Sequence, residues 1–155
     1  MDYISYLRSM VGHEKVIMNV AGALVFNEQG HVLLHLRTDN NKWGLPGGYM
    51  ELGESITDTA RREVFEETGL RLGKLKLFSV YSGPGNEKTL QSGDQVSLVQ
   101  LWFTCTDFRG QLVIQNEESL DASFFPLDAL PENLFESHYR VFKDLLSGEE
   151  TPIIR

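Results

Sequence analysis

The sequence predicts a single domain of the α/β class. A length of 155 residues matches one domain of ordinary size. Five β-rich apolar runs are separated by turn residues, and three segments carry helical spacing or capping residues. A chain of this length can bury about two thirds of its unfolded surface. Because no internal repeat, low-complexity tract or second domain is visible, we expect one domain over residues 1–155.

The first elements are expected to be a short helix and two strands. Apolar residues at mixed helical spacing predict a helix over residues 2–11. Two β-rich runs follow, at 16–26 and 31–37, and the Asn-Glu-Gln-Gly sequence between them predicts a hairpin. Residues 39–53 are rich in glycine and hold one proline, with aromatic and aliphatic side chains that can anchor them, which predicts an ordered loop.

The central helix has clear boundaries in the sequence. Ser55 is a typical N-cap, and Asp58 stands three residues later, as in a variant of the capping box. Gly69 suits the left-handed position that ends many helices. We therefore expect a helix between Ser55 and Gly69.

The remaining elements are three strands, a long loop and a closing helix. Residues 71–81 and 95–105 are predicted to be strands, and the polar loop 82–94 between them is long enough to be a candidate substrate-facing element. A short strand over 120–125 and a helix over 138–146 complete the prediction.

Composition excludes several classes of protein. Fourteen Lys and Arg against twenty-two Asp and Glu leave a net charge of −8, so nucleic acid is not an expected partner. The most apolar stretch, 16–26, is too short to cross a bilayer, and residues 1–8 lack the pattern of a secretory signal, which predicts a cytoplasmic protein without a membrane partner. The lone Cys105 excludes a disulfide framework and is expected to be a buried, inert thiol.

Three carboxylates share one face of the predicted central helix. Glu63, Glu66 and Glu67 stand at i, i+3 and i+4, within an arc of about 100°. A solvated acidic face is the ordinary alternative for such a pattern. However, the half of the helix that holds Glu63 and Glu67 also carries apolar residues: Ile56, Ala60 and Val64. These carboxylates are therefore expected to point toward protein.

Like charges one helical turn apart destabilise a helix, so a cation is expected between them. Oxygen ligands in this number suit Mg²⁺, with Mn²⁺ as an alternative, and the absence of paired His or Cys argues against zinc. Magnesium often shares its coordination shell with substrate phosphates. A metal beside a glycine-rich loop points to phosphate chemistry, with Gly47 and Gly48 as candidate substrate-binding positions.

These residues fall into a pattern that resembles a complete Nudix box. Gly48 is followed by five residues and Glu54, then by seven residues and the run Arg-Glu-Val-Phe-Glu-Glu-Thr-Gly-Leu at 62–70. The preceding residues 43–48 and Glu51 resemble the usual lead-in. The resemblance implies an α/β/α sandwich with a mixed β-sheet between helices. It also implies an enzyme that hydrolyses a nucleoside diphosphate linked to another group, with water attacking phosphorus.

The resemblance also implies roles for individual side chains. The metal ligands would be three box carboxylates and one from the loop: Glu63, Glu66, Glu67 and Glu51. Glu54 would pair with Arg62 and hold the loop against the helix. The general base is either Glu63 or an acid from a distal loop, where Glu117 and Glu118 are available. We favour Glu118 as an accessory ligand or base over a solvated loop residue.

Arg37 is the candidate substrate ligand outside the box. It lies on the polar face of the predicted strand 31–37, shortly before the glycine-rich loop, where a substrate phosphate could reach it. A surface arginine is the alternative. His35 shares this face and is a less favoured candidate.

Three functions remain open, and a further one, RNA 5′-end processing, shares the chemistry but is disfavoured by the net charge. The chain outside the box loosely resembles bacterial ADP-ribose pyrophosphatases, so the first choice is hydrolysis of ADP-ribose or a nucleotide sugar. The second is hydrolysis of a nucleoside triphosphate to monophosphate and pyrophosphate. The third is a catalytically inactive nucleotide sensor, which the retained carboxylates oppose. The expected partner is a small nucleotide, and a homodimer is left open.

Overall fold

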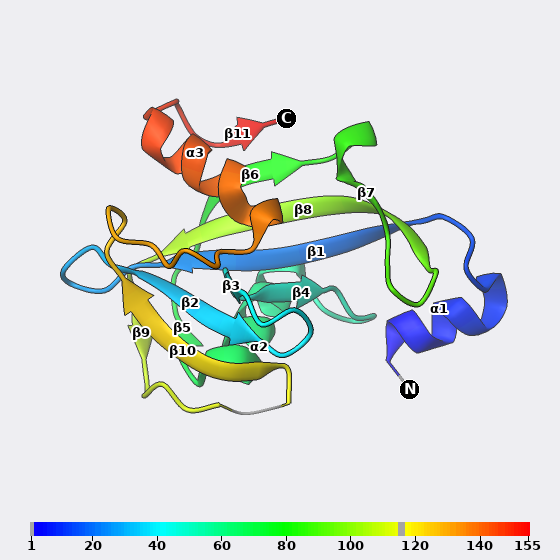
Figure 1. Cartoon of the computed structure of the whole chain (residues 1–155), viewed down its shortest axis with the longest axis horizontal. Coiled ribbons are helices and arrows are strands. Elements are labelled where there is room, and N and C mark those ends of the chain that lie inside the picture. The colour runs from blue at the N-terminus through cyan, green and yellow to red at the C-terminus, as the bar shows by residue number, and fades with distance from the viewer. Residues whose placement is uncertain (1, 115–116) are drawn as a thin grey trace.

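The computed structural model describes residues 2–114 and 117–155, and its centre is a six-stranded mixed sheet (Figure 1). The strand order is β11-β6-β8-β1-β4, with β7 paired to one end of β8. Strand β1 runs parallel to the central strand β8 and antiparallel to the edge strand β4. The strands of this sheet are β1 (Val16–Val25), β4 (Gly47–Tyr49), β6 (Lys76–Tyr81), β7 (Glu87–Thr89), β8 (Gln95–Cys105) and β11 (Ile153–Ile154).

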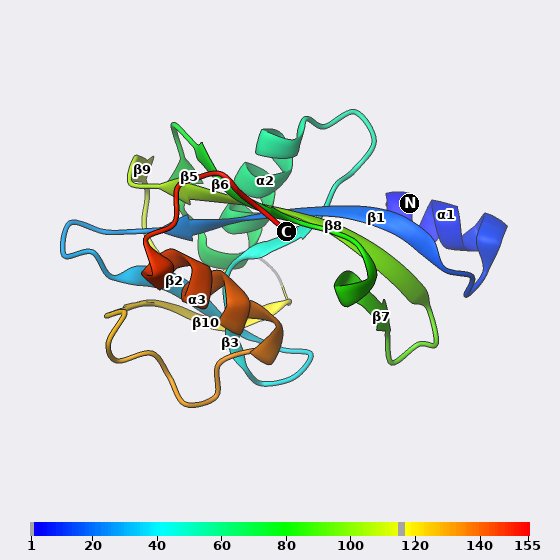
Figure 2. The ribbon, with the colours of Figure 1, turned by 90° about the horizontal axis from the view of Figure 1, so that it is seen from above.

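A smaller sheet has the order β10-β2-β3 and is antiparallel throughout. Its strands are β10 (Ser119–Phe125), β2 (Val32–Arg37) and β3 (Trp43–Gly44). A two-stranded pair, β5 (Arg71–Leu72) with β9 (Phe108–Arg109), lies near the C-terminal end of the central helix. The smaller sheet brings the turn that precedes β10 toward the central helix (Figure 2).

Helices cover both faces of the larger sheet, as Figure 2 shows. Helix α2 (Ile56–Thr68) lies on one face and α3 (Tyr139–Ser147) on the other, while α1 (Tyr3–Val11) packs at the far end of β1 and β8. Two single turns, η1 (Pro84–Asn86) and η2 (Glu136–His138), lie in the connections. This arrangement confirms the predicted α/β/α fold with a mixed sheet.

Strand β1 contributes side chains to the hydrophobic core on each face of the larger sheet. Leu24 packs with residues of the α3 side, including Phe142, whereas Ala23 packs against Val64 of α2. All four side chains are at most 4% exposed. Successive strand residues point to opposite faces, so one strand joins the two helical layers.

The predicted hairpin over 16–37 is wrong. The turn forms, with the side chain of Asn27 accepting the N–H groups of residues 29 and 31, but β1 and β2 share only the bridge between Phe26 and Val32. Beyond it the strands enter different sheets. Strand β2 buries apolar side chains on both faces, Val32 in one core and Leu33 in the other. It therefore lies between the two cores and does not continue as a neighbour of β1.

Other predicted elements differ in their details. The strand expected over 71–81 is divided into β5 and β6, and the loop 82–94 contains η1 and β7. The glycine-rich loop 39–53 contains the short strands β3 and β4, and β11 was not predicted. The first helix and the closing helix occur where they were expected. Cys105 is buried, and burial raises the pKa of its thiol, as expected for an inert group.

In the part of the chain that the structure describes, each helix is too short or too polar to cross a bilayer.

Candidate active site

Helix α2 presents the predicted carboxylates, and capping sets its boundaries. The hydroxyl of Ser55 accepts the N–H of Asp58, and the Asp58 carboxylate accepts the N–H of Ser55. At the other end Gly69 adopts a left-handed conformation with φ of 85°. With both ends defined, the register places Glu63 and Glu67 on the buried face, where they are 8% and 3% exposed.

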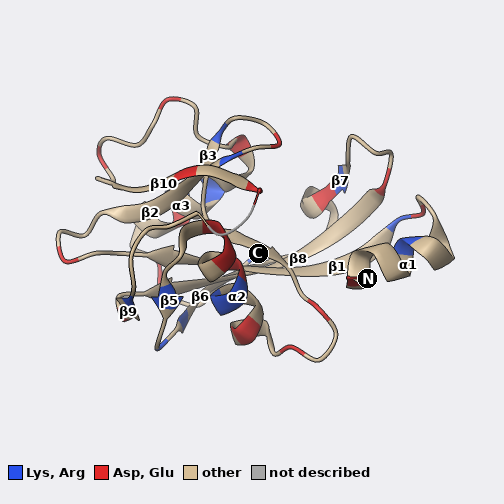
Figure 3. Ribbon diagram, turned by 90° about the horizontal axis from the view of Figure 1, so that it is seen from below, with Lys and Arg blue, Asp and Glu red and all other residues tan. Residues whose placement is uncertain are grey.

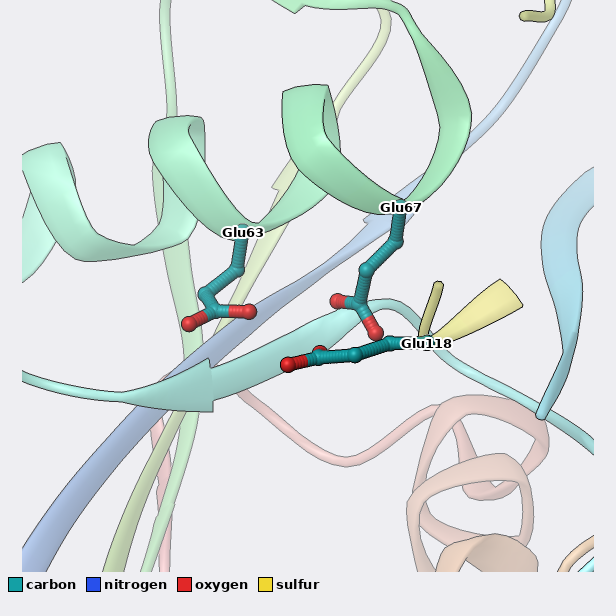
Figure 4. Close-up of side chains that lie close together, drawn as sticks. All are labelled: Glu63, Glu67 and Glu118. Carbon is teal, nitrogen blue, oxygen red and sulfur yellow. The ribbon is translucent and has the colours of Figure 1, made fainter. Parts of the chain in front are cut away.

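Glu118 joins these two glutamates. One oxygen from each of Glu63, Glu67 and Glu118 lies within 4.8 Å of the others. Figure 4 shows the two helix carboxylates pointing toward the end of Glu118, which comes from the turn before β10. Figure 3 shows acidic residues of α2 close to the acidic start of β10. The neighbouring Glu117 is exposed and lies outside this carboxylate cluster.

The carboxylate cluster is electrostatically strained without a cation. Burial, followed by repulsion from Glu67, raises the pKa of Glu63 to about 8. Burial, followed by Glu67 and Glu66, also raises the pKa of Glu118. A divalent cation would relieve this repulsion, and an all-carboxylate donor set fits a hard ion such as Mg²⁺ or Mn²⁺. The residues present therefore fit the metal site predicted from the sequence.

Gly47 and Gly48 form the cradle in which the helix carboxylates lie. The N–H of Gly47 donates to Glu67 Oε1 over 2.9 Å. A Cβ at Gly48 would collide with the carboxylate of Glu63. In the structure these glycines thus position carboxylates. The substrate contact expected of them stays a prediction, although both residues line the cavity.

The predicted pair of Glu54 and Arg62 forms. Arg62 Nε donates to Glu54 over 2.6 Å, and Nη2 donates to Glu54 and to the carbonyl oxygen of Tyr49. The Arg62 guanidinium lowers the pKa of the Glu54 carboxyl to about 2. Arg62 also contacts Glu63 and Glu66, at 2.8 and 3.3 Å. This arginine ties the loop to α2 and compensates part of the negative charge.

Glu51 and Glu66 lie further from the centre of the cluster. Glu51 accepts the N–H of Tyr3 at the start of α1, over 2.8 Å. The Glu66 side chain is 41% exposed and faces Arg62. Both line the same cavity of about 550 Å³ as the carboxylate cluster, here called the carboxylate cavity. Their predicted role as metal ligands stays a prediction.

His35 contacts one of the cluster carboxylates. Its Nε2 lies 3.0 Å from Glu67 Oε2, and its Nδ1 lies 2.7 Å from the hydroxyl of Ser119. The ring is 3% exposed and its Nε2 contact can orient Glu67; because His35 also lines the carboxylate cavity, a contact with substrate stays a prediction. The alternation of strand 31–37 placed His35 toward the polar groups, but its partner became visible only in the fold.

A second cavity of about 380 Å³ adjoins the carboxylate cavity. Arg37 lines both, as the prediction of a substrate contact requires, and its guanidinium is paired with Asp39 at 2.8 Å. Lys88 and Leu90, from the predicted substrate-facing loop, line the second cavity. Trp102 and Phe135 contribute aromatic walls. The combined space can hold a nucleotide with a second group attached.

The fold is a mixed sheet between helices, and a carboxylate cluster lies beside a glycine-rich loop. Together they are typical of hydrolases that act on phosphate compounds. Residues 17–145 match the model of the NUDIX domain. The chain is 34% identical over 131 residues to a MutT-like protein of Streptomyces ambofaciens, covering 84% of this chain and 77% of that protein. It is 31% identical over 123 residues to an ADP-ribose pyrophosphatase of Methanocaldococcus jannaschii, covering 77% and 68%.

Solved structures show the same fold. A MutT NUDIX hydrolase from Burkholderia pseudomallei has a TM-score of 0.71 at 23% identity, covering 84% of this chain and 98% of that one. The MutT protein of Bacillus halodurans has a TM-score of 0.69 at 25% identity, covering 86% and 84%. This chain belongs to the Nudix family of hydrolases.

Proposed function

We propose that this protein hydrolyses the pyrophosphate bond of a nucleoside diphosphate derivative, of the ADP-ribose or nucleotide-sugar type, with Mg²⁺. The observation that carries the proposal is the convergence of Glu63, Glu67 and Glu118 beside a cavity large enough for such a ligand. The similarity to an ADP-ribose pyrophosphatase supports this substrate class.

The side chains would divide the work as follows. Glu63 and Glu67 would hold the metal ion, with Glu66 and Glu51 as further ligands on the wall of the same cavity. When bound, the ion neutralises phosphate charge and lowers the pKa of water. Glu118, whose pKa is raised by burial and by its acidic neighbours, would accept a proton from the attacking water or add a ligand. Arg37 would bind a substrate phosphate, while Glu54 and Arg62 hold the loop.

A second candidate is the hydrolysis of a nucleoside triphosphate to a monophosphate and pyrophosphate. One relative, a putative 8-oxo-dGTP diphosphatase of Bacillus subtilis, is 41% identical over 64 residues and supports this alternative over 41% of the chain. A catalytically inactive nucleotide sensor is disfavoured because Glu54, Glu63, Glu66 and Glu67 of the box are all present.

A turnover screen tests the proposal. The purified protein is incubated with Mg²⁺ or Mn²⁺ and with ADP-ribose, nucleotide sugars, dinucleotides, nucleoside triphosphates and capped RNA, and the products are separated by chromatography. We expect metal-dependent release of AMP or another nucleoside monophosphate from a diphosphate derivative. Release of pyrophosphate from triphosphates alone would favour the second candidate. Nucleotide binding without turnover in the whole panel would contradict hydrolysis and favour a sensor.

Two further expectations belong to this proposal. Small nucleotide substrates support a cytoplasmic location, which fractionation of the source cells would test. A homodimer is left open, and the exposed apolar side chains of Tyr6, Met10 and Ile17 are compatible with it. Light scattering would measure the molar mass in solution and reject the homodimer if the mass is that of one chain.

A further inference from the structure

The second cavity lies where the far part of a substrate would reach. It shares wall residues with the carboxylate cavity, among them Arg37, Gly47, Gly48 and Tyr49. A ligand whose pyrophosphate lies at the carboxylate cluster would therefore extend one of its two attached groups into the second cavity. The side chains there select that group.

Two cations share one aromatic ring in this cavity. The ammonium of Lys88, on β7, lies 5.3 Å from the ring centre of Phe135 and donates to the hydroxyl of Ser137 over 3.0 Å. The guanidinium of Arg37 lies 4.3 Å from the centre of the same ring. All four residues line the cavity. Cation–π contacts orient both groups without neutralising either.

The acids nearby are already paired with other cations. Three acids are close in sequence to these residues, and each is paired with a cation other than Lys88: Asp39 with Arg37, Glu87 with Lys15, and Glu136 with Lys42. Among the described residues, no carboxylate lies within ion-pair distance of Lys88. The charge of Lys88 is thus held in place but not compensated.

The surroundings of Lys88 are also positive. Burial, followed by Arg37 and Arg140, lowers the pKa of the Lys88 ammonium. After burial, the same Arg37 and Lys88 help to hold the pKa of His138 well below its ordinary value, so this buried ring is neutral. A half-buried ammonium without a counter-charge is unfavourable unless a ligand supplies an anion. A phosphate dianion would form short, charge-assisted hydrogen bonds with it.

We infer that Lys88 binds a phosphate monoester on the part of the substrate that enters the second cavity. The substrate class is then a nucleoside diphosphate derivative that carries a phosphate in addition to the pyrophosphate that is cleaved. This inference rests on the proposed function, because that function places the pyrophosphate at Glu63 and Glu67.

Matched pairs of substrates that differ by one phosphate test the inference. The pairs are ADP-ribose with its 2′-phosphate, and dephospho-coenzyme A with coenzyme A, each with Mg²⁺. For at least one pair we expect the wild-type protein to prefer the phosphorylated member by about 10-fold or more in kcat/KM. Lys88→Met should reduce this ratio to below about 2, because the ammonium is lost while the aliphatic stem is kept. Lys74→Met, an exposed site outside both cavities, should keep the wild-type ratio.

The possible failures are distinguishable. If both pairs are hydrolysed without preference, or if the preference survives in Lys88→Met, the inference is overturned while the proposed function stands. If no compound is hydrolysed, the proposed function fails. Titration of the metal-free protein with 2′-AMP and with adenosine then tests whether Lys88 binds a phosphate monoester. Tighter binding of 2′-AMP that disappears in Lys88→Met supports the inference, and equal binding overturns it. Lys88→Gln replaces the methionine variant if the latter does not fold.

Discussion

The two cavities that meet at Gly47 and Gly48 carry opposite charges. The carboxylate cavity holds Glu63, Glu67 and Glu118 with only part of their charge compensated by Arg62. The second cavity holds Lys88 without a carboxylate partner in the described chain and with other cations nearby. Burial raises the pKa of Glu63 in one cavity and lowers the pKa of the Lys88 ammonium in the other, so burial disfavours the charged form in both. The difference teaches that one side is built for a cation and the other for an anion, and a metal-bound phosphate compound supplies both.

The strongest test removes one buried carboxylate. We expect Glu67→Gln to lower metal-dependent turnover by about 100-fold or more, because the amide cannot replace the charge that holds the ion. The helix should persist, since the amide can still accept the Gly47 N–H. Steady-state kinetics measures the effect, with the exposed Glu28→Gln as a matched control. Turnover close to that of the wild type would remove Glu67 from the metal site.

The next test changes the cradle and leaves every charge in place. A methyl group at Gly48 would displace the Glu63 carboxylate, so we expect Gly48→Ala to weaken Mg²⁺ affinity by about 10-fold or more. Gly85→Ala is the control, because a Cβ there meets no atom within 4 Å. Calorimetric titration with Mg²⁺ compares the two variants. Equal affinities would show that Glu63 is not held by this contact.

The third test compares Glu118, a member of the carboxylate cluster, with its neighbour Glu117. We expect Glu118→Gln to lower kcat by about 10-fold or more, with a smaller change in KM, if it accepts a proton or adds a ligand. Its neighbour Glu117 is exposed and outside the carboxylate cluster, so Glu117→Gln should stay within about 2-fold of the wild type. Initial rates over a range of substrate concentrations give both constants. An unchanged kcat for Glu118→Gln would make it a solvated residue.

The smallest expected effect is a change in the pH dependence of stability caused by the buried ring of His138, which lines the second cavity. Burial, then Arg37 and Lys88, lower the pKa of this ring, whose Nδ1 accepts the N–H of Leu45. The unfolded chain binds a proton there as the pH falls through about 6.5 and the folded chain does not, so stability decreases on the acid side.

Urea unfolding at pH 7.0 and 5.5 measures this difference. The loss in the wild type from this group should approach about 1.4 kcal/mol per pH unit below 6.5. His138→Gln is the control, because it removes the titrating group, and its stability should fall less over the same range. The same acid dependence in both proteins would show that His138 is not held neutral.

Local signals predicted the central helix and its chemistry. The N-cap at Ser55, the left-handed Gly69 and the spacing of the glutamates are all short-range features, and the structure shows each of them where it was expected. The pairing of Glu54 with Arg62 was implied by a motif of 23 residues and also forms. Such features depend on helical geometry and on neighbours in the sequence, so one chain is sufficient to predict them.

Strand pairing was less predictable. The turn at Asn27 was recognised, yet β1 pairs with β8 and β4, and β2 pairs with β10 and β3. Turn chemistry determines the reversal of the chain but not how far two strands stay together. Burial on both faces of β2 decided this pairing, and burial depends on segments distant in the sequence.

From the sequence alone came the family, the carboxylate helix, the glycine-rich loop and the expectation of a cation. Only the tertiary structure decided that Glu118, one of two candidates in its loop, joins Glu63 and Glu67, and that His35 contacts Glu67. It also decided that Lys88 lies over Phe135 with no carboxylate of the described residues within ion-pair distance. The reason is physical. Local spacing determines which side chains share one helix face, whereas the compensation of a charge depends on which distant segments pack against it.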